Sequence, residues 1–230
     1  MKERIIDFLS DLLSVVLGII ITFTIQGMID RAADRKNVRS ALELVRSELA
    51  TNMDDIMVMR GYLEQEKRSA DYFLCHLDGL DGCPADSIAF HSSVLFGNAT
   101  ISVCDDALEL LKMSSLFQKA GDNMLSMKII RAYDSCESTA RFINQRLNDH
   151  KSLFERSITA QNAGQIASSG YIDIREYLKT DFGKYAIRSV AVQASAENFT
   201  DLSDVQTAVD AIDGYLGGKR RPRPVPQTNQ

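Results

Sequence analysis

The sequence contains no tryptophan and only four prolines, three of which lie within its last nine residues. Pro84 is therefore the single proline in the first 221 residues. Because proline removes a backbone donor and breaks helices, its scarcity favours a helical fold. The net charge of -5 is modest and shows no basic excess of the kind that would indicate a nucleic-acid partner.

The common signatures of catalysis are also missing. There is no Gly-rich phosphate loop, no HExxH and no GxSxG, and the three histidines are scattered along the chain. The acidic pairs Asp54-Asp55 and Asp105-Asp106 are interpreted as exposed charges or as helix-start charges, which the helix dipole favours. We therefore expect no enzyme activity, no cofactor and no bound metal.

The composition that is present belongs to a folded protein, with 45% hydrophobic and 25% charged residues. A chain of 230 residues has room for one membrane anchor and one compact domain. A domain of that size can bury a hydrophobic core without disulfides or metals.

Residues 12–29 read LLSVVLGIIITFTIQGMI and carry no charge. At a rise of 1.5 Å per residue this run extends about 27 Å, close to the hydrocarbon core of a bilayer, roughly 30 Å thick. Lys2 and Arg4 precede it, and Arg31 follows it. One alternative is a buried helix of a soluble protein. A cleaved signal peptide is another, although Arg-Ala-Ala is a poor cleavage site. We predict an uncleaved transmembrane helix, with the lipid bilayer as partner.

A stripe of small and polar residues runs along this predicted helix at a spacing of four. Its members are Ser10, Ser14, Gly18, Thr22 and Gln26. In lipid, small residues and interhelical hydrogen bonds drive helix association. The stripe indicates packing against a second copy or another membrane protein; alternatively, its hydroxyls bond back to their own helix.

Cys75 and Cys83 bracket the loop CHLDGLDGC, which a disulfide could close in an oxidising compartment. The alternative is two unrelated thiols. A zinc site at Cys75, His76 and Cys83 would lack a fourth ligand. Cations flank the apolar run on both sides, so the cysteines guide the orientation: an N-terminus in the cytoplasm and a domain in the periplasm.

The charged region after the anchor contains a heptad pattern. Its apolar seam is Val38, Leu42, Val45, Leu49, Asn52, Ile56, Met59 and Leu63. Such a seam either lines one side of a helical bundle or mediates self-association, and a polar Asn52 within it would fix the register or face a buried water. We expect the anchor helix to continue to about Arg68.

The remaining pattern predicts further helices. Residues 69–101 are expected to form loops with one short helix, and Ser102 with Asp105 resembles a capping box that opens the next helix. Gly121-Asp122 should end that helix and cap a long central one, with a buried stripe over residues 125–158. Later helices are expected over residues 173–198 and from Asp201 or Ser203 to Tyr215.

Three side chains on or near these helices need a specific interpretation. His150 interrupts the apolar stripe, and we interpret it as a buried, hydrogen-bonded residue rather than a ligand. Cys104 and Cys136 are interpreted as buried thiols, with a disulfide between them as an alternative. The chain is thus predicted to be all-α. Residues 1–30 form a cytoplasmic stub and the transmembrane anchor, residues 31–217 an extracytoplasmic bundle of about four to five helices, and residues 218–230 a disordered basic, proline-rich tail.

Two stretches resemble a family of bacterial single-pass membrane proteins that carry a domain of unknown function. The first combines the Gly18-Ile19 step with the run Glu48-Leu49-x-x-Asn52. The second is a turn at residues 111–115, where Ser115 stands in place of the family's glycine, followed by spaced apolar residues. These apolar residues are Phe117, Leu125, Ile129 and Tyr133. The resemblance implies an extracytoplasmic helical domain behind an inner-membrane anchor and supplies no activity.

These patterns favour a non-enzymatic, membrane-anchored interaction or scaffold protein that self-associates or pairs with another membrane protein. One alternative is an extracytoplasmic ligand sensor, and another is a small channel or transporter subunit. The expected location is the bacterial inner membrane, crossed once.

Overall fold

A computed structural model describes the backbone of residues 2–156, 173–194 and 201–217, and the side chains of these residues except 1–15, 18, 19 and 27. In this part of the chain every regular element is helical, which confirms the predicted all-α class. The described residues form nine such elements, against a bundle of four or five helices expected, because predicted helices are split and the loop region is more helical than foreseen. The basic tail and Ile158 lie outside the described residues.

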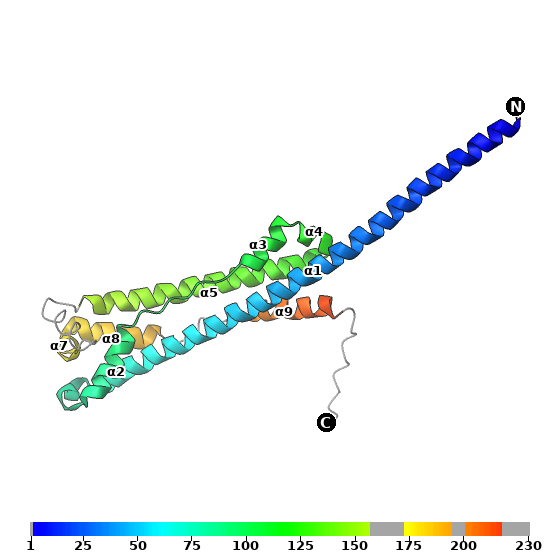
Figure 1. Ribbon diagram of the computed structural model, residues 1–230. Helices are drawn as coiled ribbons and strands as arrows, with labels where there is room; N and C mark the ends of the chain where they lie inside the picture. Colours follow the sequence, from blue (N-terminus) through cyan, green and yellow to red (C-terminus); the bar gives the residue numbers. More distant parts are fainter. Residues whose placement is uncertain (1, 157–172, 195–200, 218–230) are drawn as a thin grey trace, which may run out of the picture.

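The first helix, α1 (Lys2–Cys75), runs through the whole molecule (Figure 1). It contains no proline, and i,i+4 ion pairs such as Arg39 with Glu43 follow its exposed face. It ends seven residues beyond the expected Arg68, where the glycine-bearing helix η1 (Leu77–Gly82) begins. The N-terminal part of α1 extends away from the bundle as an arm.

The side chains described along this arm are exposed up to Ala33. Among the described residues, no helix reaches the length and hydropathy that a membrane crossing requires. The predicted crossing at residues 12–29 includes seven residues, 12–15, 18, 19 and 27, whose side chains are outside the described set.

The half of the bundle nearest the arm has its own hydrophobic core. Here α1 packs against α3 (Asp106–Met113), α4 (Leu116–Ala120), α5 (Asn123–Glu155) and α9 (Ser203–Leu216). The helices α1 and α5 run in parallel, because residues 48 and 66 of α1 contact residues 133 and 150 of α5 in the same order. The predicted stripe of α5 is buried from Leu125 to Phe154.

A second core fills the far half. It lies between the end of α1, η1, α2 (Ala85–Leu95), α7 (Arg175–Lys179) and α8 (Asp181–Gln193), around Phe73 and Phe154. On α1, Leu63 belongs to the first core and Ala70 to the second. On α5, Leu147 belongs to the first core and Phe154 to the second, so the two cores meet between these residues. Buried polar side chains occupy that level, namely Glu66 and Ser69 on α1 and His150 on α5.

Two predicted helices are split by local backbone geometry. The helix expected up to residue 120 breaks between α3 and α4, because Ser115 adopts a left-handed conformation with φ 56°. The first part, α3, begins at Asp106, and no neighbouring side chain caps it. The expected capping box of Ser102 and Asp105 is therefore wrong. The helix expected over residues 173–198 breaks at Thr180, whose hydroxyl caps α8 by accepting from the Gly183 N–H at 3.0 Å.

Gly183 itself is required at this break. A β-carbon at Gly183 would lie 2.0 Å from the carbonyl oxygen of Tyr177, so only glycine lets α7 and α8 approach this closely. Gly121, at φ 69°, ends α4 as predicted, and Asp122 caps α5 by accepting from the Leu125 N–H at 2.9 Å.

Candidate functional site

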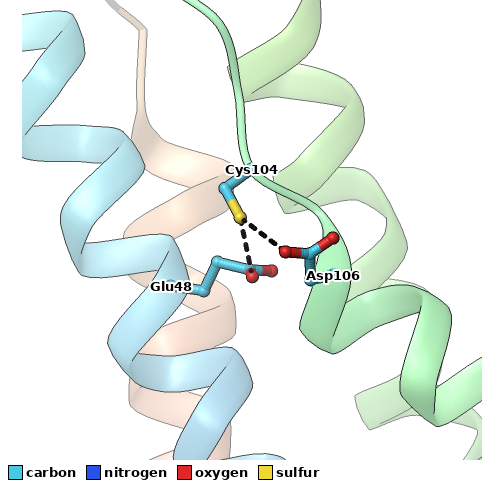
Figure 2. A group of neighbouring side chains, drawn as sticks. All are labelled: Glu48, Cys104 and Asp106. Atoms are coloured by element: carbon cyan, nitrogen blue, oxygen red, sulfur yellow. Dashed lines mark hydrogen bonds between the residues drawn. The ribbon is translucent and has the colours of Figure 1, made fainter.

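The most connected polar group in the bundle forms where residues 97–105 pass alongside α1 before entering α3. Glu48 and Asn52 stand four residues apart on α1, so both point to the same side of that helix. Figure 2 shows Glu48 facing Cys104 of the connecting segment and Asp106 of the first turn of α3. Sequence reasoning expected a helix start at this place but not its partners.

Two asparagines hold the connecting segment by its backbone. Asn52, which is 2% exposed, accepts from the Cys104 N–H at 2.9 Å and donates to the Cys104 carbonyl at 2.8 Å. Asn144 of α5 likewise accepts from the Ile101 N–H at 2.9 Å and donates to the Ile101 carbonyl at 2.7 Å. Asn52, the polar residue in the heptad seam, thus satisfies backbone groups of the connecting segment. This contact takes the place of the two roles expected from the heptad pattern, which were to fix the register or to face a buried water.

Glu48 serves three donors at once. Its carboxylate accepts from the Tyr133 hydroxyl at 2.5 Å, from the Ala107 N–H at 3.2 Å and from the Cys104 thiol at 3.2 Å. Ala107 is in the first turn of α3, where N–H groups lack partners and the dipole favours a negative charge. Glu48 therefore caps α3 from another helix, in place of the expected local capping box.

The same contacts set the proton affinities of the group. The pKa of Tyr133 is raised by burial and by the Glu48 carboxylate, which accepts a hydrogen bond from the Tyr133 hydroxyl. At Cys104 the Asp106 N–H lowers the pKa of the thiol, but the hydrogen bond to Glu48, burial and the charges of Glu48 and Asp106 outweigh it, so the net shift is upward. The thiol is thereby kept protonated and weakly nucleophilic.

Glu48, Cys104 and Asp106 also offer donor atoms that all lie within 4.8 Å of one another, the spacing of a metal site. A thiolate with two carboxylates suits a borderline cation such as Zn²⁺, which needs a fourth donor and a deprotonated thiol. The raised pKa of Cys104 and the donors already bound to Glu48 oppose that use. The group fits a helix cap better than a metal centre.

The predicted seam residues have a clear outcome. All eight are buried inside the bundle, from Val38 at 1% exposed to Leu63 at 1%, against α3, α4, α5 and α9. The seam therefore lines the bundle, and this face of α1 is covered by helices of the same chain. The acidic pair Asp54-Asp55 is exposed as expected.

The other predicted residues are less informative. In the predicted stripe of small and polar residues, Thr22 and Gln26 are exposed, while the side chains of Ser10, Ser14 and Gly18 are outside the described set. Cys75 and Cys83 are free thiols in the structure, so their disulfide stays a prediction about an oxidising compartment.

The remaining cysteines and the histidine are placed by the structure. Cys136 is buried, which raises the pKa of its thiol to about 11. Cys104 is exposed rather than buried, and both thiols are free. His150 is buried and its Nδ1 lies 2.9 Å from Glu66 Oε2, as expected of a packed histidine, but its acidic partner was missed.

A wide hollow lies on the other side of the connecting segment, between residues 101–112 and α5. Its volume is about 740 Å³. Charged and amide side chains dominate the lining, among them Asp105, Asp134, Glu137, Arg141 and Asn144. Small-molecule sites are mostly apolar with a few polar groups, so this hollow has the character of a polar surface.

Comparison with protein-family models, curated proteins and solved structures found no match for this chain. The resemblance carried by Glu48, Asn52 and the turn at residues 111–115 therefore stays a prediction. Within that turn, Ser115 has a left-handed backbone with φ 56°, a conformation that favours glycine.

Proposed function

We propose that this protein is a membrane-anchored helical bundle that acts by interaction rather than catalysis. The observation that carries the proposal is the exposed apolar surface of the α1 arm. Its large apolar side chains are 43% to 73% exposed and point around the whole helix. They are Val16, Leu17, Ile20, Ile21, Phe23, Ile25, Met28 and Ile29.

Such a surface is costly in water. Burying one large apolar side chain is worth about 1.5–3 kcal/mol, so transferring eight of them into hydrocarbon gains on the order of 10–20 kcal/mol. A single-pass helix satisfies its own backbone groups and can therefore enter lipid. The uncharged run at residues 12–29 and the cations that follow it, Arg31 and Arg35, match the boundary of a bilayer.

The arm and the bundle share one helix, which gives the anchor a mechanical consequence. α1 continues from the apolar run to Val38, the first buried residue of the bundle, without a break. The bundle is thus held at a fixed distance and angle from the arm. A rigidly placed bundle suits a platform or scaffold next to the membrane.

Lateral contact is proposed through the arm. Thr22 and Gln26 are exposed on the small and polar stripe, and close packing of small residues is what joins helices in lipid. The seam at residues 38–63 is occupied by the bundle itself. Self-association, or pairing with another membrane protein, is therefore assigned to the stripe.

The proposed location is the bacterial inner membrane, with the N-terminus in the cytoplasm and the bundle in the periplasm. The support is the pair Cys75 and Cys83 at the two ends of η1, where a short loop can be closed by oxidation. A non-enzymatic role is supported by the low reactivity of Cys104 and by the pairing of His150 with Glu66. The polar hollow beside α5 does not favour the sensor alternative.

The proposal is tested by flotation of the full chain with phospholipid vesicles. The unmodified chain should float with the vesicles. A variant carrying Ile20→Arg and Ile21→Arg should stay at the bottom of the gradient, because two charges at mid-depth oppose insertion. Leu44→Arg is the matched control, since Leu44 is 53% exposed on the bundle part of α1.

The two outcomes separate clearly. Circular dichroism should show the same helicity in all three proteins, because Ile20, Ile21 and Leu44 are exposed and belong to neither core. An unmodified chain that remains at the bottom with folded helicity contradicts the anchor. For self-association, Gly18→Leu should lower the yield of cross-linked dimer in vesicles, and an unchanged yield removes the stripe as the contact.

A further inference from the structure

The end of the bundle nearest the arm carries an exposed apolar corner that neither core uses. Met113, the last residue of α3, is 85% exposed, and Met124, in the first turn of α5, is 69% exposed. Between them lies α4, whose Leu116 is buried against the proximal core. Figure 1 shows α4 beside α1 at the point where the arm leaves the bundle.

We infer that this corner, formed by Met113, α4 and Met124, rests in the lipid headgroup layer of the membrane that holds the arm. The inference rests on the proposed anchor and deepens it, because it names a second contact with the same bilayer. It assigns a partner to the two methionines that are exposed at this end of the bundle.

One ion pair marks the level along α1 at which α4 packs. Lys119 Nζ lies 2.8 Å from Asp34 Oδ1, which ties α4 to α1 five residues beyond Ile29. Five residues of helix rise about 7.5 Å. The whole bilayer is about 40–45 Å thick around a core of about 30 Å, which leaves a headgroup layer of about 5–7 Å on each side. A span that ends at Ile29 therefore brings α4 to the outer part of that layer.

The chemistry of the corner fits this depth. Methionine is apolar and flexible, so from the outer part of the layer its side chain can reach in among the headgroups. Lys112 is exposed next to Met113, and Arg31 and Arg35 are exposed on the facing turns of α1. These cations would meet lipid phosphates at the surface.

Most acidic groups at this end are engaged or set back. Asp34 pairs with Lys119, and the Asp122 side chain accepts from the Leu125 N–H at the start of α5. Glu109 lies one turn of α3 before Met113, further from the arm. Asp30 is the exception, because it is exposed between Ile29 and Arg31. The exposed groups at this end therefore include the two methionines, the cations Arg31, Arg35 and Lys112, and the carboxylate of Asp30.

The absence of tryptophan makes the test direct, because one introduced tryptophan is a unique reporter. The reporters are Met113→Trp and Met124→Trp at the corner, Ile20→Trp in the arm, and Val192→Trp as a distal control. Val192 is 76% exposed on α8, at the far half of the bundle. Each full-length variant is reconstituted in vesicles of zwitterionic and anionic phospholipid that contain a quencher either on the headgroup or deep in the acyl chain.

The corner reporters should lose emission to the headgroup quencher and little to the deep quencher. Ile20→Trp should lose emission chiefly to the deep quencher, and Val192→Trp to neither. Omitting the anionic lipid should reduce the loss at Met113→Trp and leave Ile20→Trp unchanged.

Three results would overturn the inference, and they point to different causes. Corner reporters as unquenched as Val192→Trp, with Ile20→Trp quenched, would refute the corner contact and keep the anchor. Corner emission that shifts to the blue with protein concentration, independent of quencher, would assign the corner to a second copy of the chain. An unquenched Ile20→Trp would remove the proposed anchor and the corner contact with it.

Discussion

Asn52 of α1 and Asn144 of α5 hold the same connecting segment, each by pairing with both the N–H and the carbonyl of one residue. Their partners, Cys104 and Ile101, are three residues apart. The backbone N–H and carbonyl groups of Cys104 and Ile101 thereby find hydrogen-bond partners between two parallel helices, although the segment has no secondary structure of its own. In a sheet, the neighbouring strands would supply such partners. This pairing fixes where α3 starts and hence where Glu48 meets it.

Asn52→Leu should lower the free energy of unfolding by about 2–4 kcal/mol. Two hydrogen bonds are lost and the N–H and carbonyl of Cys104 are left without partners, at about 1–3 kcal/mol for a buried unsatisfied group. Urea unfolding followed by circular dichroism measures the change. Asn148→Ala, at an exposed position one turn beyond Asn144, is the control and should stay within about 0.5 kcal/mol. A tolerated leucine at position 52 would show that water replaces the asparagine.

Glu48→Gln should make Cys104 more reactive. The Glu48 carboxylate raises the pKa of the Cys104 thiol by its hydrogen bond and its charge, so the neutral amide lowers that pKa and increases the thiolate fraction at a given pH. Iodoacetamide labelling of Cys104 across pH 7–10, read by peptide mass spectrometry, should show the rate profile moving to lower pH. Asp54→Asn, on the exposed face of α1, should leave it in place. A profile that moves upward or not at all would contradict the assigned contact.

His150→Leu should destabilise the protein by about 3–5 kcal/mol at pH 8. The change leaves the Glu66 carboxylate, which is 3% exposed, buried without its histidine partner. From the apolar stripe alone, leucine at position 150 would be expected to cost less than about 1.5 kcal/mol. The buried acid reverses that expectation. Adding Glu66→Gln should recover most of the loss, and failure to recover it would mean that His150 acts by shape alone.

The pH dependence of that effect has a definite sign. Burial raises the pKa of Glu66 above its ordinary value of 4.5, with the His150 hydrogen bond opposing the shift. The folded state thus binds this proton more tightly than the unfolded state, so its contribution to stability is greatest below pH 4.5 and is lost as pH rises through the raised pKa. Urea midpoints of the unmodified protein and Glu66→Gln should therefore converge near pH 4 and diverge in favour of Gln as pH rises.

Ser115→Gly should raise the free energy of unfolding by about 0.5 kcal/mol. Ser115 has φ 56°, a conformation that costs an L-residue about 1 kcal/mol and costs glycine almost nothing, less the extra entropy of glycine in the unfolded chain. Gly121→Ser, at φ 69°, is the matched reverse change and should lower stability by about 1 kcal/mol. Thermal or urea unfolding of both variants measures the two signs, and a loss at Ser115→Gly would contradict the left-handed turn.

The periodic parts of this fold could be predicted from the sequence. Spacings of three and four placed Leu49 and Ile129 on buried faces because the period of a helix is set by the backbone itself. Gly121 and Asp122 were informative because their preferences are local. Each of these predictions needed only neighbouring residues.

The parts that failed depend on distant partners or on rare backbone states. Glu48 and Tyr133 are separated by 85 positions, and nothing local indicates which acid meets which hydroxyl. A buried tyrosine does need a hydroxyl partner, and that was the one signal available for this contact. The breaks at Ser115 and Thr180 were missed because neither residue is a strong helix breaker.

Whether residues 12–29 carry the chain through a bilayer is tested most directly by labelling thiols from one side. A membrane-impermeant maleimide is applied to spheroplasts that express the full chain with Lys2→Cys and Val192→Cys, and labelling before and after lysis is compared at the two introduced thiols. Val192 is 76% exposed on the bundle. The proposed arrangement predicts that position 192 is labelled in intact spheroplasts and that position 2 is labelled only after lysis. The reverse order would keep the crossing and place the bundle in the cytoplasm. Labelling of both sites at the same stage would contradict the crossing itself.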